Sequence, residues 1–174
     1  QVKAWMLNTK NYGVAQSRRR VFFVGFREDL GITPTPPVGS TKTIAMGKVL
    51  DGISGGPERL TSIARRYWPL LRPGESASKY HPKGHWFGLI KCDPNKPCPT
   101  IISGGMRLVH WSERRYLGPL ELSALSSFPK DFKFPCSNLD TIKQIGNCVP
   151  PKMTEAIARH VCSLLSIEAQ VSHV

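Results

Sequence analysis

The chain has 174 residues, 40% of them hydrophobic, which is enough apolar material for one domain or two small lobes. No apolar run approaches the roughly 20 residues that a membrane-spanning helix requires, and no secretory signal opens the sequence. The five cysteines are scattered and odd in number, so they do not predict a disulfide framework, and a reducing cytoplasm is the expected setting.

The formal net charge of +12 is unevenly distributed along the chain. Residues 1–30 carry six Lys and Arg against two acids, residues 31–115 carry thirteen against five, and residues 116–174 carry five of each. The positive field therefore lies on the first two-thirds of the chain and favours a polyanionic partner. Charge alone leaves nucleic-acid binding and a merely soluble basic protein equally open.

Two strands and a basic loop are predicted at the start of the chain. Residues 2–8 and 21–26 are apolar and rich in aromatic and β-branched side chains, and the short connection predicts an antiparallel pair. The connecting loop holds side chains that suit phosphates or the acceptor edge of a base: Gln16, Arg18, Arg19 and Arg20. A basic loop on a solvated surface is the alternative interpretation.

Pro and Gly become frequent between residues 31 and 114, which indicates a separate, irregular, mostly β lobe. Short helices are predicted over 46–53 and 57–68, and short strands over 86–90 and 100–103. Four possible metal ligands do not have the spacing of a zinc site, so no metal is predicted: His81, His85, Cys92 and Cys98.

The last third of the chain returns to regular structure. Pro119 is expected to open one helix and Pro150-Pro151 another, the second with a buried stripe at 153, 157, 161 and 164. Gly146-Asn147 is interpreted as a tight turn before the second helix. Free N–H groups at the start of that helix would suit a carboxylate, with an ordinary capped helix as the alternative. The tail after Ser166 is expected to be frayed.

Three segments, in this order, resemble the last three conserved blocks of the DNA (cytosine-5) methyltransferase family. Gln16-x-Arg18-x-Arg20, within YGVAQSRRRVFFVGF, resembles the eighth block, and Arg115 with LGPLELSALSSFP resembles the ninth. Gln144-x-Gly146-Asn147-x-Val149-Pro150-Pro151 resembles the tenth. PCPTIISGGM (97–106) is similar to the segment that ends the family's target-recognition domain.

The resemblance covers residues 2 to about 165 and implies an α/β fold. That fold would be a partial edge of a Rossmann-like methyltransferase sheet plus a small, mostly β, irregular target-recognition lobe. Edge strands and the arginine loop of the catalytic domain would occupy residues 1–30, and the target-recognition domain residues 31–114. Residues 115–166 would return to the catalytic domain with its closing helix, and 167–174 would be a tail.

The resemblance also implies roles for individual residues. Family members flip a cytosine out of duplex DNA, attack it with a cysteine and transfer a methyl group to it from S-adenosylmethionine. The catalytic pocket would include Gln16, Arg18 and Arg20, with Arg20 facing the cytosine. DNA would be contacted by Arg19, Thr100, Gly104, Gly105 and Arg107, and the cofactor by Gln144, Asn147, Cys148 and Val149.

The family's cofactor loop and nucleophile are not found in this sequence. No F-x-G-x-G loop follows a first strand, and the Pro-Cys pairs at 97–98 and 135–136 are not followed by Gln. We therefore expect the C-terminal part of a cytoplasmic, bacterial or phage enzyme of restriction–modification type. It would bind double-stranded DNA and share S-adenosylmethionine with an N-terminal half in the same or a separate chain. The alternatives are a DNA-binding module without catalysis and an inactive remnant.

Overall fold

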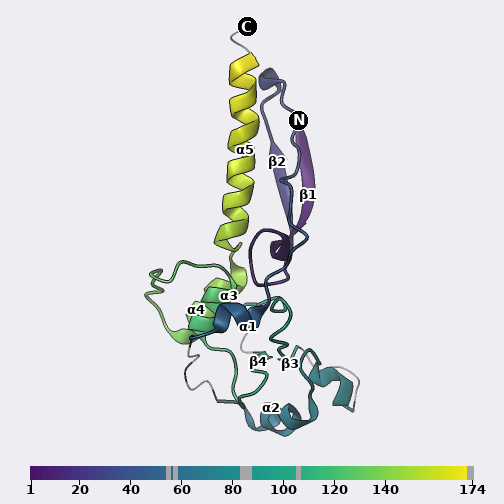
Figure 1. Cartoon of the computed structure of the whole chain (residues 1–174), viewed down its shortest axis with the longest axis vertical. Helices are drawn as coiled ribbons and strands as arrows, with labels where there is room; N and C mark the ends of the chain where they lie inside the picture. The colour runs from purple at the N-terminus through teal and green to yellow at the C-terminus, as the bar shows by residue number, and fades with distance from the viewer. Residues whose placement is uncertain (54–55, 57–58, 83–87, 105–106, 172–174) are drawn as a thin grey trace.

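The structure is a computed structural model that describes residues 1–53, 56, 59–82, 88–104 and 107–171, with side chains up to residue 166. The molecule is elongated (Figure 1). A β-hairpin and a long helix occupy one end, a group of short helices lies in the middle, and a small irregular lobe forms the other end.

The hairpin consists of β1 (Val2–Asn8) and β2 (Arg19–Gly25), which pair antiparallel from Val2↔Gly25 to Asn8↔Arg19. This pairing confirms the prediction from the sequence. The connection contains a 3-10 turn, η1 (Thr9–Asn11), and a second turn, η2 (Glu28–Leu30), follows β2.

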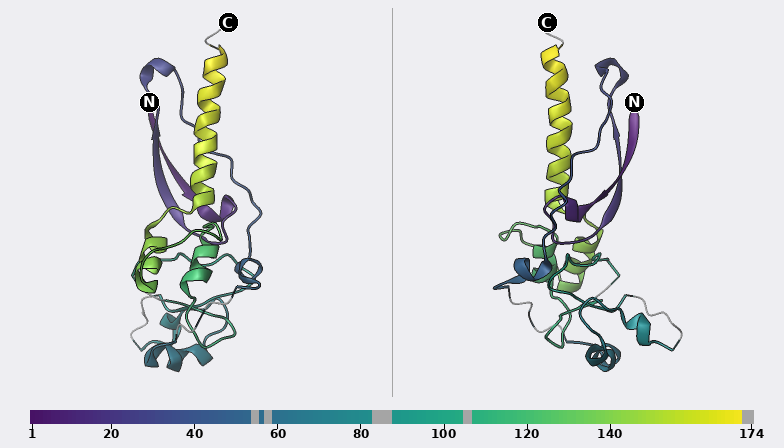
Figure 2. Two further views of the ribbon diagram at one scale, coloured as in Figure 1. Left: turned by 90° about the vertical axis from the view of Figure 1, so that its left-hand side faces the viewer. Right: turned by 45° about the vertical axis from the view of Figure 1, so that its right-hand side comes forward.

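The long helix α5 (Pro151–Val171) lies beside the hairpin in both views of Figure 2. Buried Trp5 of β1 meets the ring of His160 of α5 edge-on, with 6.5 Å between ring centroids. The predicted stripe at 153, 157, 161 and 164 is the less exposed side of the helix. The frayed tail was predicted too early, because α5 continues past Ser166 through residues that favour helix and include no Pro or Gly.

The main core lies among α1 (Met46–Leu50), α3 (Pro119–Leu125) and α4 (Asn138–Asn147). Helix α3 begins at Pro119 as predicted, whereas α4 was missed. The side chain of Ser137 caps the start of α4 by accepting the N–H of Asp140. The helix runs to Asn147, so Gly146-Asn147 is the end of a helix and the predicted tight turn was wrong.

The irregular lobe contains α2 (Ser62–Tyr67), two 3-10 turns, η3 (Trp68–Leu70) and η4 (Ala77–Tyr80), and a two-residue parallel pair. The pair joins β3 (Ile90–Lys91) to β4 (Leu108–Val109). Helix α2 starts later than the predicted 57–68 because Thr61 caps it by accepting the N–H of Ala64. Helix α1 also ends earlier than the predicted 46–53.

Two strand predictions in this lobe had different outcomes. Residues 86 and 87 of the predicted strand 86–90 lie outside the described residues, and of the remaining three only Ile90 belongs to a strand, β3. The predicted strand 100–103 was wrong: these residues form no strand, and the chain just before them makes a single parallel bridge, Gln16↔Cys98, with the arginine loop. No helix among the described residues is long and apolar enough to cross a membrane.

Candidate functional site

The arginine loop is anchored inside the protein by Gln16. Its side chain is 1% exposed, and its amide Nε2 donates to the hydroxyl of Ser126, at the end of α3, at 3.0 Å. The hydroxyl of Thr9 donates to the backbone oxygen of Gln16 at 2.5 Å. The N–H of Ser17 donates to the carbonyl of Cys98 at 2.8 Å. The loop is therefore held from three directions, as a preorganised site requires.

Arg18 is also buried, with 3% of its surface exposed. One guanidinium nitrogen donates to the carbonyl of Ile101 and the other to the carbonyl of Gly146. Its fork thus joins the segment that leaves the irregular lobe to the last turn of α4. A Cβ built on Gly146 would lie 2.4 Å from the backbone of Ile102 and Ser103, so this close approach requires glycine.

Arg19 and Arg20 differ from Arg18 in exposure. Arg19 is exposed, and Arg20 is half-buried and donates to the carbonyl of Arg19 at 2.7 Å. Burial lowers the pKa of Arg18, and the positive charge of Arg20 lowers it further. Burial raises the pKa of the Cys148 thiol, while the charges of Arg18 and Arg20 oppose that rise. The structure therefore brings the arginine loop and the residue after α4 into one positively charged cluster.

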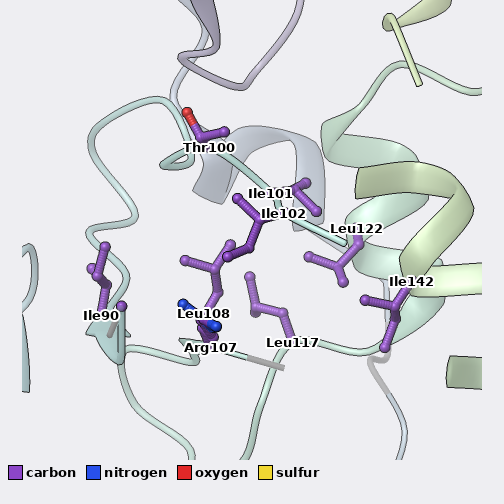
Figure 3. A pocket seen from close by; sticks show the side chains of 10 residues that line it. Ile90, Thr100, Ile101, Ile102, Arg107, Leu108, Leu117, Leu122 and Ile142 are labelled. Carbon is purple, nitrogen blue, oxygen red and sulfur yellow. The ribbon is translucent and has the colours of Figure 1, made fainter. Parts of the chain in front are cut away.

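Thr100 and Arg107 line a common pocket of about 180 Å³ (Figure 3). The hydroxyl of Thr100 donates to the carbonyl of Ser17 at 2.8 Å, so it fixes the arginine loop while remaining exposed. The rest of the lining is mainly aliphatic: Ile90, Ile101, Ile102, Leu108, Leu117, Leu122 and Ile142. Such walls offer few partners for a nucleobase or a charged cofactor, which indicates that this pocket is not the cofactor site.

The predicted glycine pair at the end of this segment is only partly described. Gly104 is exposed, and Arg107 lies across it with a guanidinium nitrogen 3.4 Å from the position of a Cβ. Gly105 lies outside the described residues.

The predicted cofactor residues lie where α4 meets α5. Gln144 and Asn147 are exposed, one helical turn apart, while Cys148 and Val149 are half-buried. The free N–H groups expected at the start of α5 are not available. Lys152 N–H donates to Ser127 Oγ at 3.2 Å, and the next two N–H groups donate to the carbonyl of Pro150. Any ligand at this junction must therefore be held by side chains.

Ser126 and Ser127 were missed as members of the site. The hydroxyl of Ser126 accepts the side-chain amide of Gln16, and the hydroxyl of Ser127 accepts the N–H of Lys152 in the first turn of α5. Ser127 has a left-handed φ of 63°. The only signal in the sequence is a Ser-Ser pair between a helix and a Phe-Pro turn, which is common at helix ends. The pair connects the arginine loop to the end of α3 and to the start of α5.

The cluster around Arg115 connects the irregular lobe to α3. Its guanidinium donates to both oxygens of Glu121, at 2.7 and 3.0 Å, and to Glu113 at 2.8 Å. Glu121 is 1% exposed and also accepts the N–H of Gly118 at 2.8 Å. A bidentate, buried pair of this kind fixes geometry, so this part of the ninth block is structural.

The two cysteines considered as nucleophiles are in different surroundings. Cys98 is fully buried, and burial raises the pKa of its thiol well above the usual range. Cys136 is exposed, and its sulfur lies 3.3 Å from the hydroxyl of Thr141. A thiol is activated by nearby cations or a base, and Cys98 has neither advantage. Among the described residues, no group of His, Cys, Asp and Glu could hold a metal ion.

A mixed α/β fold of the methyltransferase kind is supported by solved structures. A DNA modification methyltransferase encoded within an Escherichia coli prophage matches 95% of this chain and 61% of its own, with a TM-score of 0.77 and 18% identity. A methyltransferase from Entamoeba histolytica matches 92% of this chain with a TM-score of 0.51 and 11% identity. At these identities, the likeness establishes the fold alone.

Sequence comparison identifies the family. The model of the C-5 cytosine-specific DNA methylases matches residues 1–63 and 61–163. The Type II methyltransferase M.NgoFVII of Neisseria gonorrhoeae is 30% identical over 95% of this chain, and M1.HphI of Haemophilus parahaemolyticus is 29% identical over 94%. The chain belongs to the C-5 cytosine-specific DNA methylase family. It spans about half the length of these relatives, 50% and 48%.

Proposed function

We propose that this chain is the DNA-recognising, cofactor-closing part of an S-adenosylmethionine-dependent DNA (cytosine-5) methyltransferase of restriction–modification type, acting in a bacterial cytoplasm. The observation that carries the proposal is the joining of three distant segments by one buried loop. Arg18 holds the end of the irregular lobe against the end of α4, and Gln16 anchors the same loop to the end of α3. The charge of Arg20 also acts on the Cys148 thiol and opposes the rise in its pKa.

In this proposal Arg20 contacts the flipped base. Among the three consecutive arginines, Arg20 is the half-buried one. It lies on strand β2, and its guanidinium donates a hydrogen bond to the carbonyl of Arg19. A guanidinium there can donate to the acceptor edge of a cytosine and stabilise negative charge that develops on the ring. Residues 31–114 form the target-recognition lobe, and Arg19, Thr100, Gly104, Gly105 and Arg107 are the proposed DNA contacts.

The residues at the α4–α5 junction fit one end of the proposed cofactor. Exposed carboxamides of Gln144 and Asn147, one turn apart, can bind the amino and carboxylate groups of a methionine moiety, and Val149 offers an apolar contact. S-adenosylmethionine supplies the methyl group when it is bound. The backbone N–H groups at the start of α5 are already used, so they take no part in this binding.

The proposal includes an N-terminal half that carries the nucleophile and covers the outer face of the hairpin. On that face Met6 pairs with Val21 and Ala4 with Phe23, and the exposures of Met6, Val21 and Phe23 are 68, 50 and 76%. Apolar cross-strand pairs left open in this way are typical of a surface covered by another element. The relatives extend over about twice the length matched here, which supplies the covering segment.

The test is transfer of labelled methyl from S-adenosylmethionine to duplex DNA of mixed sequence. We expect no transfer by this chain alone and transfer when the N-terminal half of a relative such as M.NgoFVII is added. The restored activity should be lost in Arg20→Leu and kept in Arg27→Leu, whose exposed side chain pairs with Asp29 at 2.9 Å. Methyl transfer by the chain alone would contradict the half-enzyme proposal. DNA binding without any restored transfer would indicate a binding module instead.

A further inference from the structure

The end of the molecule farthest from the hairpin carries arginines that the site described above does not use. Helix α2 lies at this end in Figures 1 and 2. The stretch from residue 59 to 72 contains four arginines and no Asp or Glu. Arg65 and Arg66 are adjacent, exposed residues in the last turns of α2.

Trp68 forms the centre of this surface. It follows α2 directly and lies three residues after Arg65, so the two occupy the same side of the helical turn. Its indole N–H donates to the carbonyl of His110 at 3.1 Å, which fixes the ring. Lys91 Nζ lies 3.7 Å from the ring centroid, and the guanidinium carbon of Arg114 lies 5.5 Å from it. Arg114 is therefore held over an immobilised aromatic ring.

The acids described between residues 59 and 121 already pair with other cations. Glu113 and Glu121 both accept from Arg115, and Glu75 pairs with Lys79 at 2.7 Å. Among the described residues, no carboxylate lies within ion-pair distance of Arg65, Arg66 or Arg114. Exposed lysines and arginines elsewhere, such as Lys143 and Arg159, do have such partners.

The loop that carries Arg114 is rigid. The ring nitrogen Nδ1 of buried His110 accepts the N–H groups of Ser112 and Glu113, at 3.3 and 3.1 Å, and the ring stacks on Trp111 at 3.9 Å. Preorganised guanidinium groups lose little entropy when they bind, and their planar forks match phosphate oxygens.

We propose that Arg65 and Arg66 of α2, together with Arg114 over Trp68, bind the phosphate backbone of duplex DNA flanking the target, as a second contact independent of the arginine loop. The proposal rests on the proposed function in taking DNA as the partner. Phosphate contacts position a protein without reading sequence, so this surface contributes affinity and not target choice. An acidic protein partner is the alternative occupant, and the test separates the two.

The test measures the affinity of this chain for short duplexes of mixed sequence, by fluorescence anisotropy at a series of salt concentrations. The variant Arg65→Ala/Arg66→Ala/Arg114→Ala should bind every duplex more weakly by a similar factor. The slope of log affinity against log salt should fall by about 0.9 for each phosphate that is no longer neutralised, or about 2 to 3 for the three arginines. The control Arg27→Ala/Lys143→Ala/Arg159→Ala removes the same charge from ion-paired positions and should change the slope by less than about 0.9.

A second variant distinguishes a lost DNA contact from a loss of folded protein. Arg65→Gln/Arg66→Gln leaves the contact between Trp68 and Arg114 intact, and should lower the slope by about 2 with unchanged thermal unfolding. An unchanged slope in both variants, or an equal loss in the control, overturns the inference while DNA binding by the chain still supports the proposed function. A wild-type chain that does not bind DNA overturns both.

Discussion

Gly146 is the residue at which the last turn of α4 touches the segment that leaves the irregular lobe. Its absent Cβ would lie 2.4 Å from backbone atoms of Ile102 and Ser103, and backbone cannot move aside as the end of a side chain can. Gly146→Ala should therefore lower the free energy of unfolding by about 1–3 kcal/mol, although alanine is the better helix former. Urea denaturation measures this change.

The matched control for that substitution is Gly104→Ala. A Cβ at Gly104 would meet the guanidinium end of Arg107 at 3.4 Å and a methyl group of Ile102 at 4.0 Å, both of which can move. We expect a change of less than about 0.5 kcal/mol in this variant. Equal losses in the two variants would show that the contact of Gly146 with the 102–103 backbone is not the cause.

His110 makes the stability of the lobe depend on pH. Burial lowers the pKa of its ring, and the charge of Arg115 lowers it further. The unfolded chain therefore binds a proton at higher pH than the folded protein does, so stability present above about pH 6.5 is lost as the pH falls below it. The loss approaches at most about 1.4 kcal/mol per pH unit.

His110→Asn isolates this contribution. The amide oxygen of Asn can accept backbone N–H groups as Nδ1 of His110 does, but the side chain does not titrate. Urea midpoints at a series of pH values between about 7 and 5 should therefore fall more steeply for wild type than for the variant. Parallel pH profiles would mean that His110 is protonated equally easily in both states.

At the scale of elements, the open face of the hairpin is the feature with the clearest consequence. Met6→Gln/Phe23→Gln changes two side chains that are 68 and 76% exposed, so the free energy of unfolding of this chain should change by less than about 1 kcal/mol. If the N-terminal half covers this face, the methyl transfer that it restores should be lost, because two polar amides would be buried without partners.

Val38→Gln is the corresponding control, since Val38 is 96% exposed and lies outside the hairpin. It should reduce neither stability nor restored activity. Full restored activity in the Met6→Gln/Phe23→Gln variant would place the covering half elsewhere on the molecule. Chemical denaturation and the methyl-transfer assay give the two measurements.

The elements that could be predicted from sequence are those with their own periodic signal. The hairpin alternates and is bounded by a polar loop, and α3 and α5 begin with proline. Helix α4 was missed because its apolar residues are few and Gly146-Asn147 resembles a turn. The strands β3 and β4 have two residues each, too short for any period, and exist because tertiary contacts pair them.

At the scale of the whole molecule, the family could be predicted from motifs. The different burial of Arg18, Arg19 and Arg20 could not. Arg18, Arg19 and Arg20 are chemically identical, and only packing makes the first buried, the second exposed and the third half-buried. Likewise, the sequence indicated neither that Thr100 holds the arginine loop nor that Gln16 reaches Ser126. These are contacts between segments more than 80 residues apart, for which local pattern carries no information.

Arg18 gives this long-range organisation a test, because one side chain joins segments around residues 15–18, 98–103 and 144–148. Arg18→Lys keeps the positive charge, but an ammonium group does not reproduce the guanidinium fork that reaches both carbonyls. We expect a loss of about 1.5–3 kcal/mol in unfolding free energy. Native-state hydrogen exchange should speed up in all three segments together, because each loses its link to the others. Arg19→Lys, at the exposed neighbour, should change neither measurement. Faster exchange confined to residues 15–18 would mean that Arg18 anchors its own loop and does not couple the irregular lobe to the end of α4.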